Sequence, residues 1–391
     1  MDIFWEKSGW ENEDRHLLFL KKMPFNRKFP FIPEAPGLYI IRGPRQIGKS
    51  SWLKTILLNY SKKNKSCFYL SCEILESFKE LTEILRSVSN RDIILLDEIT
   101  FVKDWDRSIK HFVDSGYKGI IVITGSHIHD LKTGSDRMPG RFDGGGEYYL
   151  LPMDFHEFRA VRNQAGWSQS KLEDLECYFR VGGFPIAVAE AGKKGEIPKK
   201  ALETYWKWLS GDIVRLGRQE SYLSEIMIQV ALTMQTPISY QSLAKKTSLG
   251  SHNTIQEYLS ILESCFAVRI LPAIDISTGA VKIKKNKKIY FTDPLIYWLA
   301  LSLGRVKVKD YSYDKLAEMC ANEYISRNLK RFGYFSADSG EIDFVSPKNW
   351  AIEVKWSKIV TNLSKAYLSH TSPYKTVWTQ DSIFDDLPND E

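Results

Sequence analysis

Runs of apolar residues divide the first third of the chain into strands and helices. Residues 38–41 form a short apolar strand, and a glycine-bounded loop joins it to a helix whose apolar residues recur at helical spacing. Two later runs, DIILLDEIT and GIIVITGS, are apolar at nearly every position, as expected of parallel strands that are buried on both faces. The pattern predicts an α/β domain with a parallel sheet over residues 37–160, after a lead segment of residues 1–36.

The middle of the chain changes to helical periodicity. The pattern over residues 171–217 is mostly helical, and a turn in VGGFPIAV interrupts it, which predicts a helical domain over residues 161–225. Farther on, Ser239 can cap a short helix, LGS forms a turn, and Ser251 can cap a longer second helix, as in a helix-turn-helix. Together with the strand VKIKKNKKIYF, these elements predict a winged helix over residues 226–292.

Near the C-terminus, apolar and charged residues are interleaved in the stretch GEIDFVSPKNWAIEVKWS. It predicts two strands, residues 341–345 and 350–356, joined by a turn. If the turn is centred on Lys348, antiparallel pairing places Asp343 directly opposite Glu353. The pattern therefore predicts two carboxylates that face each other across a hairpin.

These facing carboxylates are candidate metal ligands. Two such groups repel each other unless a cation or a proton lies between them, and magnesium binds one or two carboxylates together with water and phosphate oxygens. Lys355 points to the same face as Glu353, where it could orient an attacking water or offset charge on a phosphate. The alternative is that Asp343, Glu353 and Lys355 form a salt-bridged surface cluster.

Composition narrows the class of protein. The chain has 391 residues, of which 43% are hydrophobic and 26% charged, as in a soluble globular protein of two to four domains. Its five cysteines include no CxxC pair, so we expect buried free thiols and no zinc site. No apolar run is long enough for a membrane span, and the N-terminus does not resemble a signal peptide. We therefore expect a cytoplasmic protein without a membrane partner.

A phosphate-binding motif follows the first strand. Residues 43–50, GPRQIGKS, match the pattern GxxxxGK[ST], in which backbone N–H groups cradle phosphate oxygens. Lys49 would reach the β and γ phosphates, and the Ser50 hydroxyl would ligate Mg²⁺. The predicted nucleotide-binding residues are Gly43, Pro44, Arg45, Gln46, Ile47, Gly48, Lys49, Ser50, Ser51, Thr124 and Ser126.

Polar residues at the ends of two apolar runs complete the predicted ATP site. Asp97 ends one run, where it would hold the Mg²⁺ shell, and Glu98 would polarise the attacking water as general base. Thr124 and Ser126 end the next run, where they could sense the γ-phosphate. The alternative is a parallel α/β core with chance acids at its strand ends. The sequence predicts an ATP-binding domain that hydrolyses ATP with Mg²⁺.

The strand after the helix-turn-helix is strongly basic, although the net charge of +6 for the whole chain requires no nucleic-acid partner. Because alternate strand residues face one way, Lys282, Lys284 and Lys288 could follow a phosphate backbone. We therefore predict binding of double-stranded DNA; the alternative is a winged helix that packs against the ATPase or a protein partner. The five lysines of the strand are Lys282, Lys284, Lys285, Lys287 and Lys288, and the polar residues that could meet base edges are His252, Asn253, Thr254 and Gln256.

The motifs GPRQIGKS, LLDEI, ITGS, PGRF…LLPMDFHEF and VGGFPIAV occur in the order seen in a group of prokaryotic AAA+-type ATPases, which the chain resembles over roughly residues 37–357. The resemblance implies an ATPase core with a helical lid, a winged helix, and a C-terminal domain of uncharacterised function with a restriction-endonuclease-like core. Arg141 in MPGRFDG is the candidate for an arginine that stabilises transferred phosphate, in a neighbouring subunit of a homo-oligomer. The alternative is an arginine that anchors its loop.

The C-terminal hairpin also resembles a known family, because it has the D…ExK arrangement of PD-(D/E)xK nucleases. The resemblance implies an α/β nuclease-like domain over residues 293–380, with catalytic residues Asp343, Glu353 and Lys355. It also implies a further metal ligand from the preceding helix, for which Glu323 is the match. The alternative is a nuclease fold that has lost activity. In either case, we expect the acidic tail of residues 381–391 to be mobile.

Three functions follow from these predictions. The first is a Mg²⁺-dependent, DNA-associated ATPase whose ATP cycle positions or gates a nuclease-like domain. The second is a non-catalytic, ATP-switched binder of DNA or protein with a degenerate nuclease fold. The third is an ATPase that acts on protein partners without nucleic acid.

Overall fold

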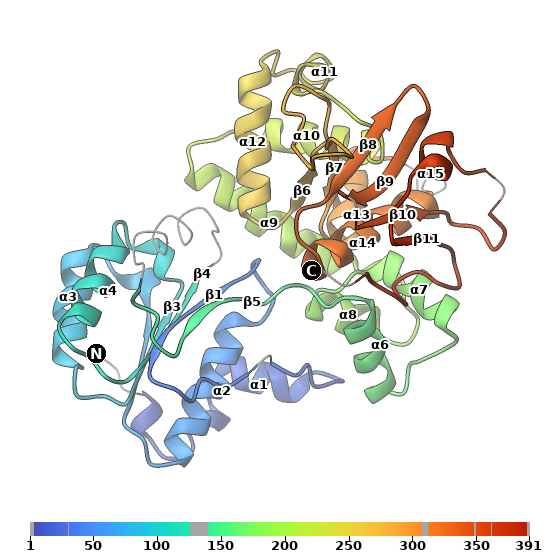
Figure 1. Cartoon of the computed structure of the whole chain (residues 1–391). Coiled ribbons are helices and arrows are strands. Elements are labelled where there is room, and N and C mark those ends of the chain that lie inside the picture. The colour runs from blue at the N-terminus through green and yellow to red at the C-terminus, as the bar shows by residue number, and fades with distance from the viewer. Residues whose placement is uncertain are drawn as a thin grey trace. The chain divides into compact units, whose positions relative to one another are not determined.

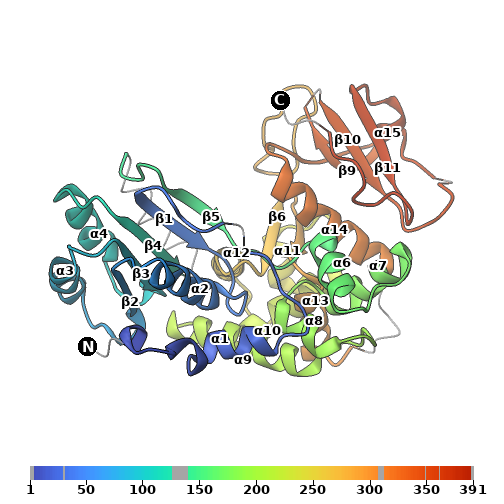
Figure 2. The same ribbon diagram turned by 90° about the horizontal axis from the view of Figure 1, so that it is seen from below.

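The computed structural model describes residues 4–29, 31–125, 140–306, 312–347, 349–360 and 362–388. The chain divides into two compact units, Met1–Pro152 and Met153–Glu391, whose elements are labelled in Figures 1 and 2. Ser126 and Lys348 lie outside the described residues. None of the helices in the described ranges is long and apolar enough to cross a membrane.

The first unit contains the predicted parallel sheet. Its five strands run in the order β2-β3-β4-β1-β5, and the four strand pairs that the structure describes in this sheet are all parallel. The apolar runs form the central strands because their side chains are buried on both faces. The strands are β1 (Gly37–Arg42), β2 (Cys67–Ser71), β3 (Ile93–Asp97), β4 (Ile120–Gly125) and β5 (Gly146–Tyr149).

Helices and short 3₁₀ helices precede the first strand and connect the later ones. The segment before β1 is ordered on this unit: Trp5 and Trp10 are buried, and Asp14, the N-cap of the first α-helix, forms an ion pair with Lys54 at 3.3 Å. The α-helices are α1 (Arg15–Lys22), α2 (Lys49–Lys62), α3 (Phe78–Ser87) and α4 (Trp105–Asp114); the 3₁₀ helices are η1 (Phe4–Glu6), η2 (Trp10–Asn12), η3 (Cys72–Ile74) and η4 (Ile99–Phe101).

The second unit begins with helices. The turn in VGGFPIAV needs glycine, because a Cβ on Gly183 would lie 1.9 Å from the Met153 carbonyl oxygen. The Gly183 N–H donates to Asp293, which also caps a later helix. The helices are α6 (Phe155–Gln164), α7 (Lys171–Val181), α8 (Pro185–Ala191), α9 (Lys199–Arg215), α10 (Glu220–Thr233) and α13 (Pro294–Leu303).

Two capped helices lie where the sequence predicts a helix-turn-helix. Ser239 caps α11 (Tyr240–Lys245), Ser251 caps α12 (His252–Ser264), and each serine hydroxyl accepts a backbone N–H of its helix. An antiparallel pair follows, β6 (Val268–Leu271) with β7 (Lys288–Phe291). The predicted strand through VKIKKNKKIYF is wrong in its first part, because β7 begins only at Lys288. Residues 281–287 form a loop instead, which we call the basic loop.

The C-terminal part is a mixed four-stranded sheet of order β11-β10-β9-β8, with one helix before β8 and another before β11. β9 pairs antiparallel with both β8 and β10, whereas β10 and β11 are parallel. Ile342, Val345, Ala351 and Tyr367 form part of its core. The elements are α14 (Tyr313–Asn328), β8 (Gly333–Ala337), β9 (Gly340–Ser346), β10 (Trp350–Val354), α15 (Lys365–Ser369) and β11 (Tyr374–Trp378).

The sequence predicts a mobile acidic tail. The described part of this tail instead packs against the second unit. Ile383 and Phe384 are each only 1% exposed. Phe384 lies against the rings of Phe155 and Trp378, and Lys171 pairs with Asp385 at 2.5 Å. Two apolar residues within the acidic stretch therefore attach it to the second unit.

Candidate functional site

The phosphate-binding loop joins β1 to the N-terminus of α2. Gly43 approaches the backbone so closely that a Cβ there would lie 2.0 Å from the Leu150 carbonyl oxygen. Lys49 is buried, and its Nζ donates to the carbonyl oxygens of Gly43 at 3.0 Å and Pro44 at 2.9 Å. Burial lowers the pKa of Lys49, an effect that Glu98 opposes. The ammonium group is therefore held beside the loop that would cradle phosphate.

The carboxyl ends of β3 and β4 bring the predicted acids to this lysine. Asp97 accepts hydrogen bonds from the Thr124 hydroxyl at 2.5 Å and from the Tyr69 hydroxyl at 3.0 Å. Thr124 also accepts the Glu98 N–H at 3.1 Å, and Glu98 has a left-handed φ of 50°. A Glu98 carboxylate oxygen lies 3.7 Å from Lys49 Nζ. Thr124 thus holds Asp97 and Glu98 at the edge of the sheet from which the phosphate-binding loop starts.

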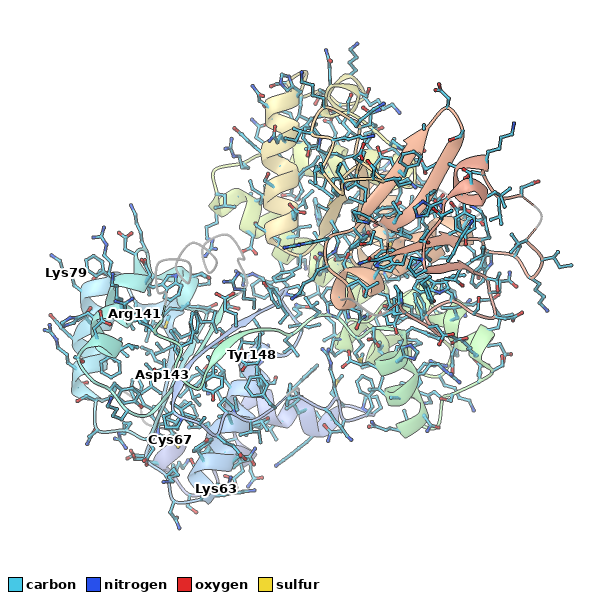
Figure 3. All side chains as sticks on the ribbon, in the orientation of Figure 1. Lys63, Cys67, Lys79, Arg141, Asp143 and Tyr148 are labelled. Carbon is cyan, nitrogen blue, oxygen red and sulfur yellow. The ribbon has the colours of Figure 1, made fainter. Side chains whose placement is uncertain are left out.

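Arg141 lies beside α4 (Figure 3) rather than at this edge. Its Nε and Nη2 donate to the two carboxylate oxygens of Asp114, the last residue of α4, at 2.7 and 3.1 Å. The Asp114 hydrogen bonds raise the pKa of Arg141. Of the two interpretations open from the sequence, this bidentate pair favours an arginine that anchors its loop.

In the second unit, the hairpin of β9 and β10 has the register that a turn centred on position 348 requires, since Phe344 pairs with Ile352. Continuing this register places Asp343 beside Glu353. Lys355 Nζ lies 2.9 Å from Glu353 and 3.8 Å from Asp343. Asp343 and Glu353 are 7% and 2% exposed, so this group is not a surface cluster.

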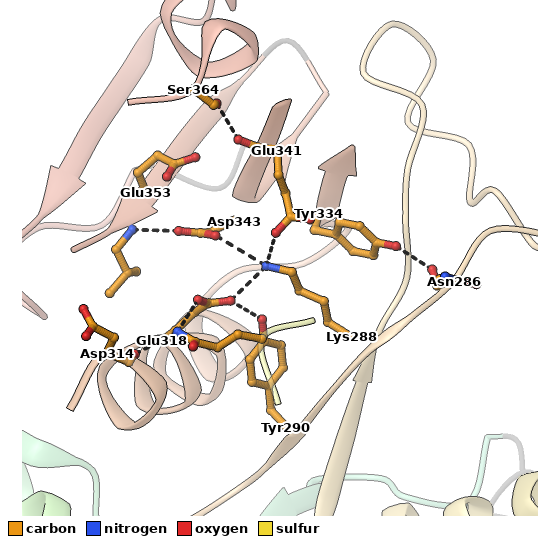
Figure 4. A network of polar contacts seen from close by, with 12 residues as sticks. Asn286, Lys288, Tyr290, Asp314, Glu318, Tyr334, Glu341, Asp343, Glu353 and Ser364 are labelled. Carbon is orange, nitrogen blue, oxygen red and sulfur yellow. Dashed lines mark hydrogen bonds and ion pairs between the residues drawn. The ribbon is translucent and has the colours of Figure 1, made fainter. Parts of the chain in front are cut away.

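A second lysine lies among the carboxylates of Glu318, Glu341 and Asp343 (Figure 4). Lys288, the first residue of β7, is 1% exposed. Its Nζ lies 2.9 Å from Glu318, 2.5 Å from Glu341 and 3.4 Å from Asp343. Although burial acts to lower it, the pKa of Lys288 is raised by Glu318 and the other carboxylates. We call Lys288, Lys355 and the acids Glu318, Glu341, Asp343 and Glu353 the carboxylate cluster.

The cluster's acids also use neutral hydrogen-bond donors. Glu318 accepts the Tyr290 hydroxyl on one oxygen and the Gln235 amide on the other, the latter at 2.7 Å. Asp343 accepts the Val354 N–H at 3.0 Å. Burial, with a further contribution from Asp343, raises the pKa of Glu318 and of Glu353 to about 7.

The structure corrects the helix acid that the nuclease resemblance implied. Glu323 does not face the cluster: its two oxygens pair with Arg269 at 2.9 Å and Arg327 at 3.0 Å. Glu318 faces the cluster instead. Five residues along an α-helix correspond to about 500° of rotation, so Glu318 and Glu323 lie on different faces of α14.

The predicted metal site of Asp343, Glu353 and Glu323 is therefore not assembled. Within the described ranges, no group of three or more Asp, Glu, His or Cys side chains is arranged to hold a metal ion. The oxygen atoms that would bind magnesium face the Lys288 and Lys355 ammonium groups instead. The residues do not fit a divalent ion in this arrangement.

The basic loop differs from its predicted form. Lys282 pairs with Asp275 at 3.3 Å, and Lys288 is buried, whereas Lys284 and Lys285 are exposed. Ile283 at its tip is 79% exposed. The loop lines a pocket of about 290 Å³, which it shares with Ser239 and Tyr240 at the start of α11 and His252 at the start of α12.

Comparison with known proteins finds family models that match two parts of the chain. Residues 35–159 match a family model described as an AAA domain, and residues 172–306 match one described as a domain of unknown function. The first unit thus combines a P-loop motif and a parallel sheet with similarity to AAA domains, and we call it the AAA+ domain. The second match includes Lys288, whereas the acids of the carboxylate cluster lie beyond residue 306, outside both matches.

Similarity over most of the chain is distant. Two uncharacterised proteins of Methanocaldococcus jannaschii are 25% and 22% identical over 334 and 351 residues, covering 80% and 79% of this chain and 70% and 72% of theirs. Solved structures that match are the ORC2 protein of Aeropyrum pernix (11% identity, 70% of this chain, 89% of that chain, TM-score 0.36) and AMPPCP-bound DnaA of Aquifex aeolicus (17%, 65%, 86%, 0.33).

Sequence reasoning missed several residues at both sites. In the AAA+ domain, Tyr69 was missed because it comes from β2, outside the motifs, and reaches Asp97 only in the folded sheet. In the second unit, the sequence pattern predicts that Lys288 contacts DNA phosphates. Its place next to the apolar residues IYF was a signal that it is buried. Glu318 and Glu341 carried no signal beyond being acids in the right elements.

Proposed function

We propose that the chain is a Mg²⁺-dependent ATPase associated with DNA, whose ATP cycle positions or gates the nuclease-like C-terminal domain. The observation that carries the ATPase proposal is the meeting of Lys49, Asp97 and Glu98 at one edge of the parallel sheet. Incoming ATP would take Lys49 from the Gly43 and Pro44 carbonyl oxygens to its own phosphates, and the loop N–H groups would bind phosphate oxygens.

The remaining roles follow from the same geometry. Ser50 and Asp97 supply the oxygen ligands that suit magnesium, which when bound would neutralise charge on the β and γ phosphates. Glu98 would act as general base, because moving Lys49 to the phosphates frees its carboxylate for a water. Thr124 keeps both acids in place through its two hydrogen bonds.

Nucleotide binding and phosphate release test this proposal. Lys49→Ala should lose most nucleotide binding, whereas Glu98→Gln should bind ATP and fail to hydrolyse it. Lys62→Ala is the matched control, since Lys62 is an exposed lysine at the other end of the same helix. Hydrolysis at the parent rate in Glu98→Gln would refute the general-base role.

DNA association rests on the second unit. The capped helix-turn-helix and the exposed Lys284 and Lys285 support it, since a basic loop beside a recognition helix can contact phosphates. The order α14-β8-β9-β10-α15-β11, with only the last strand pair parallel, supports a nuclease-like fold for the C-terminal domain.

A second candidate for that domain is a non-catalytic scaffold, and Lys288 within the carboxylate cluster favours it. Incubation with DNA, Mg²⁺ or Mn²⁺ and ATP, with a gel readout of strand cleavage, distinguishes the two candidates. Cleavage that disappears in Asp343→Ala would support a nuclease. No cleavage in a preparation that hydrolyses ATP would support the scaffold.

A further inference from the structure

The position of Lys288 suggests a role for the carboxylate cluster that differs from metal binding. We propose that Lys288 is a built-in counter-cation that takes the place of a divalent metal and joins β7 to the C-terminal sheet. This inference does not depend on ATP hydrolysis by the AAA+ domain, so its failure would leave that proposal standing.

The first argument is geometric. Oxygens from Glu318, Glu341 and Asp343 converge on one point, and Lys288 Nζ occupies it at 2.5 to 3.4 Å. Magnesium needs oxygen ligands at about 2.0–2.1 Å. An ion bound by these oxygens would lie against the ammonium group and be repelled by it, so the two cations exclude each other.

The second argument is that Lys288 is fixed in place on both sides. Just before it, Lys287 exchanges backbone hydrogen bonds with Ile238 at 2.9 and 3.0 Å, and the Tyr334 hydroxyl donates to the Asn286 carbonyl oxygen at 2.6 Å. Just after it, β7 pairs with β6. The Lys288 side chain is only 1% exposed. Folding of the chain thus places the ammonium group in the cluster. A metal ion would have to bind from solution, which costs translational entropy, and it could dissociate again.

The third argument is that the acids come from separate elements. Glu318 lies on α14, and Glu341 and Asp343 lie on β9, while Lys288 and Tyr290 come from the strand that follows the helix-turn-helix. The pairs span 30 and 55 residues of sequence between Lys288 and Glu318 or Asp343. The cluster therefore joins the β6–β7 pair to the C-terminal domain, as a metal ion bound by the same acids could do.

Calorimetric titration with Mn²⁺ in the absence of nucleotide tests the proposal on the full chain. Wild type and Asp343→Asn should give the same Mn²⁺ binding, because neither has a metal site in the cluster. Lys288→Met removes the ammonium and nearly keeps its volume, so it should gain one Mn²⁺ site. Lys288→Met/Asp343→Asn should lose that site, and Lys285→Met, which removes an exposed lysine of the adjoining loop, should gain none.

Two results would overturn the proposal. One is Mn²⁺ binding by wild type that Asp343→Asn removes, since it would show a metal bound beside Lys288. The other is a folded Lys288→Met protein that gains no Mn²⁺ site. If Lys288→Met does not fold, wild type and Asp343→Asn still decide the matter through melting temperatures with Mn²⁺ and with chelator. An equal response of the two supports the proposal, and a Mn²⁺-dependent rise confined to wild type refutes it.

Discussion

The basic loop gives a quantitative prediction for DNA binding. Lys284 and Lys285 are exposed and have no carboxylate partner among the residues that the structure describes. Lys282 is already paired with Asp275, and Lys288 is buried in the carboxylate cluster. The basic loop therefore has two lysines available to contact phosphate, whereas the strand predicted from the sequence would have presented three.

The size of the effect follows from counterion release. Each phosphate contact adds about 0.9 to the slope of log K against log salt on duplex DNA, so Lys284→Ala/Lys285→Ala should lower the slope by about 1.8. Between 50 and 200 mM salt, the affinity advantage of wild type over this variant should then shrink about tenfold. Lys282→Ala should change the slope by less, because Asp275 competes for that ammonium group.

Fluorescence anisotropy with a mixed-sequence duplex at several salt concentrations measures these slopes. Lys193→Ala/Lys194→Ala is the matched control, since it removes two adjacent exposed lysines from the loop after α8. An unchanged slope in the Lys284/Lys285 variant, or an equal loss in the control, would show that the basic loop is not the contact. Absence of wild-type binding at low salt would remove DNA association altogether.

Three further predictions concern the other parts of the chain. Lys288→Met should lower the free energy of unfolding by about 3–5 kcal/mol, because it leaves two buried carboxylates and the partly exposed Glu341 without their shared cation, whereas Lys285→Met should change it by less than about 0.5 kcal/mol in denaturant unfolding. Arg141→Ala and Asp114→Ala should slow ATP hydrolysis equally if Arg141 only anchors its loop; a loss of about a thousandfold or more in Arg141→Ala alone would show that it contacts transferred phosphate. Gly43→Ala should abolish nucleotide binding, because its Cβ would lie 2.0 Å from the Leu150 oxygen and displace the loop; normal binding to a nucleotide analogue would contradict this.

Several local elements of the fold could be predicted from patterns of neighbouring residues. The apolar runs became β3 and β4 because uninterrupted apolar strands suit a sheet covered on both faces. Ser239 and Ser251 marked two helix starts because a hydroxyl at that position satisfies a free backbone N–H. The register of the β9–β10 hairpin followed from the position of its turn. Each of these features depends on residues that are near one another in the chain.

Which charged side chains meet depends instead on how distant elements pack together. The periodicity of α14 separates Glu318 from Glu323 but does not say which face of the helix lies on the sheet, and Glu318 is the acid that reaches Lys288. Lys288 itself reads as one more lysine of a basic strand until β7 is placed beside β9 and α14. Burial then makes its charge costly unless carboxylates from distant segments surround it. The partners of a buried charge depend on how the elements pack together, and local sequence patterns do not contain that information.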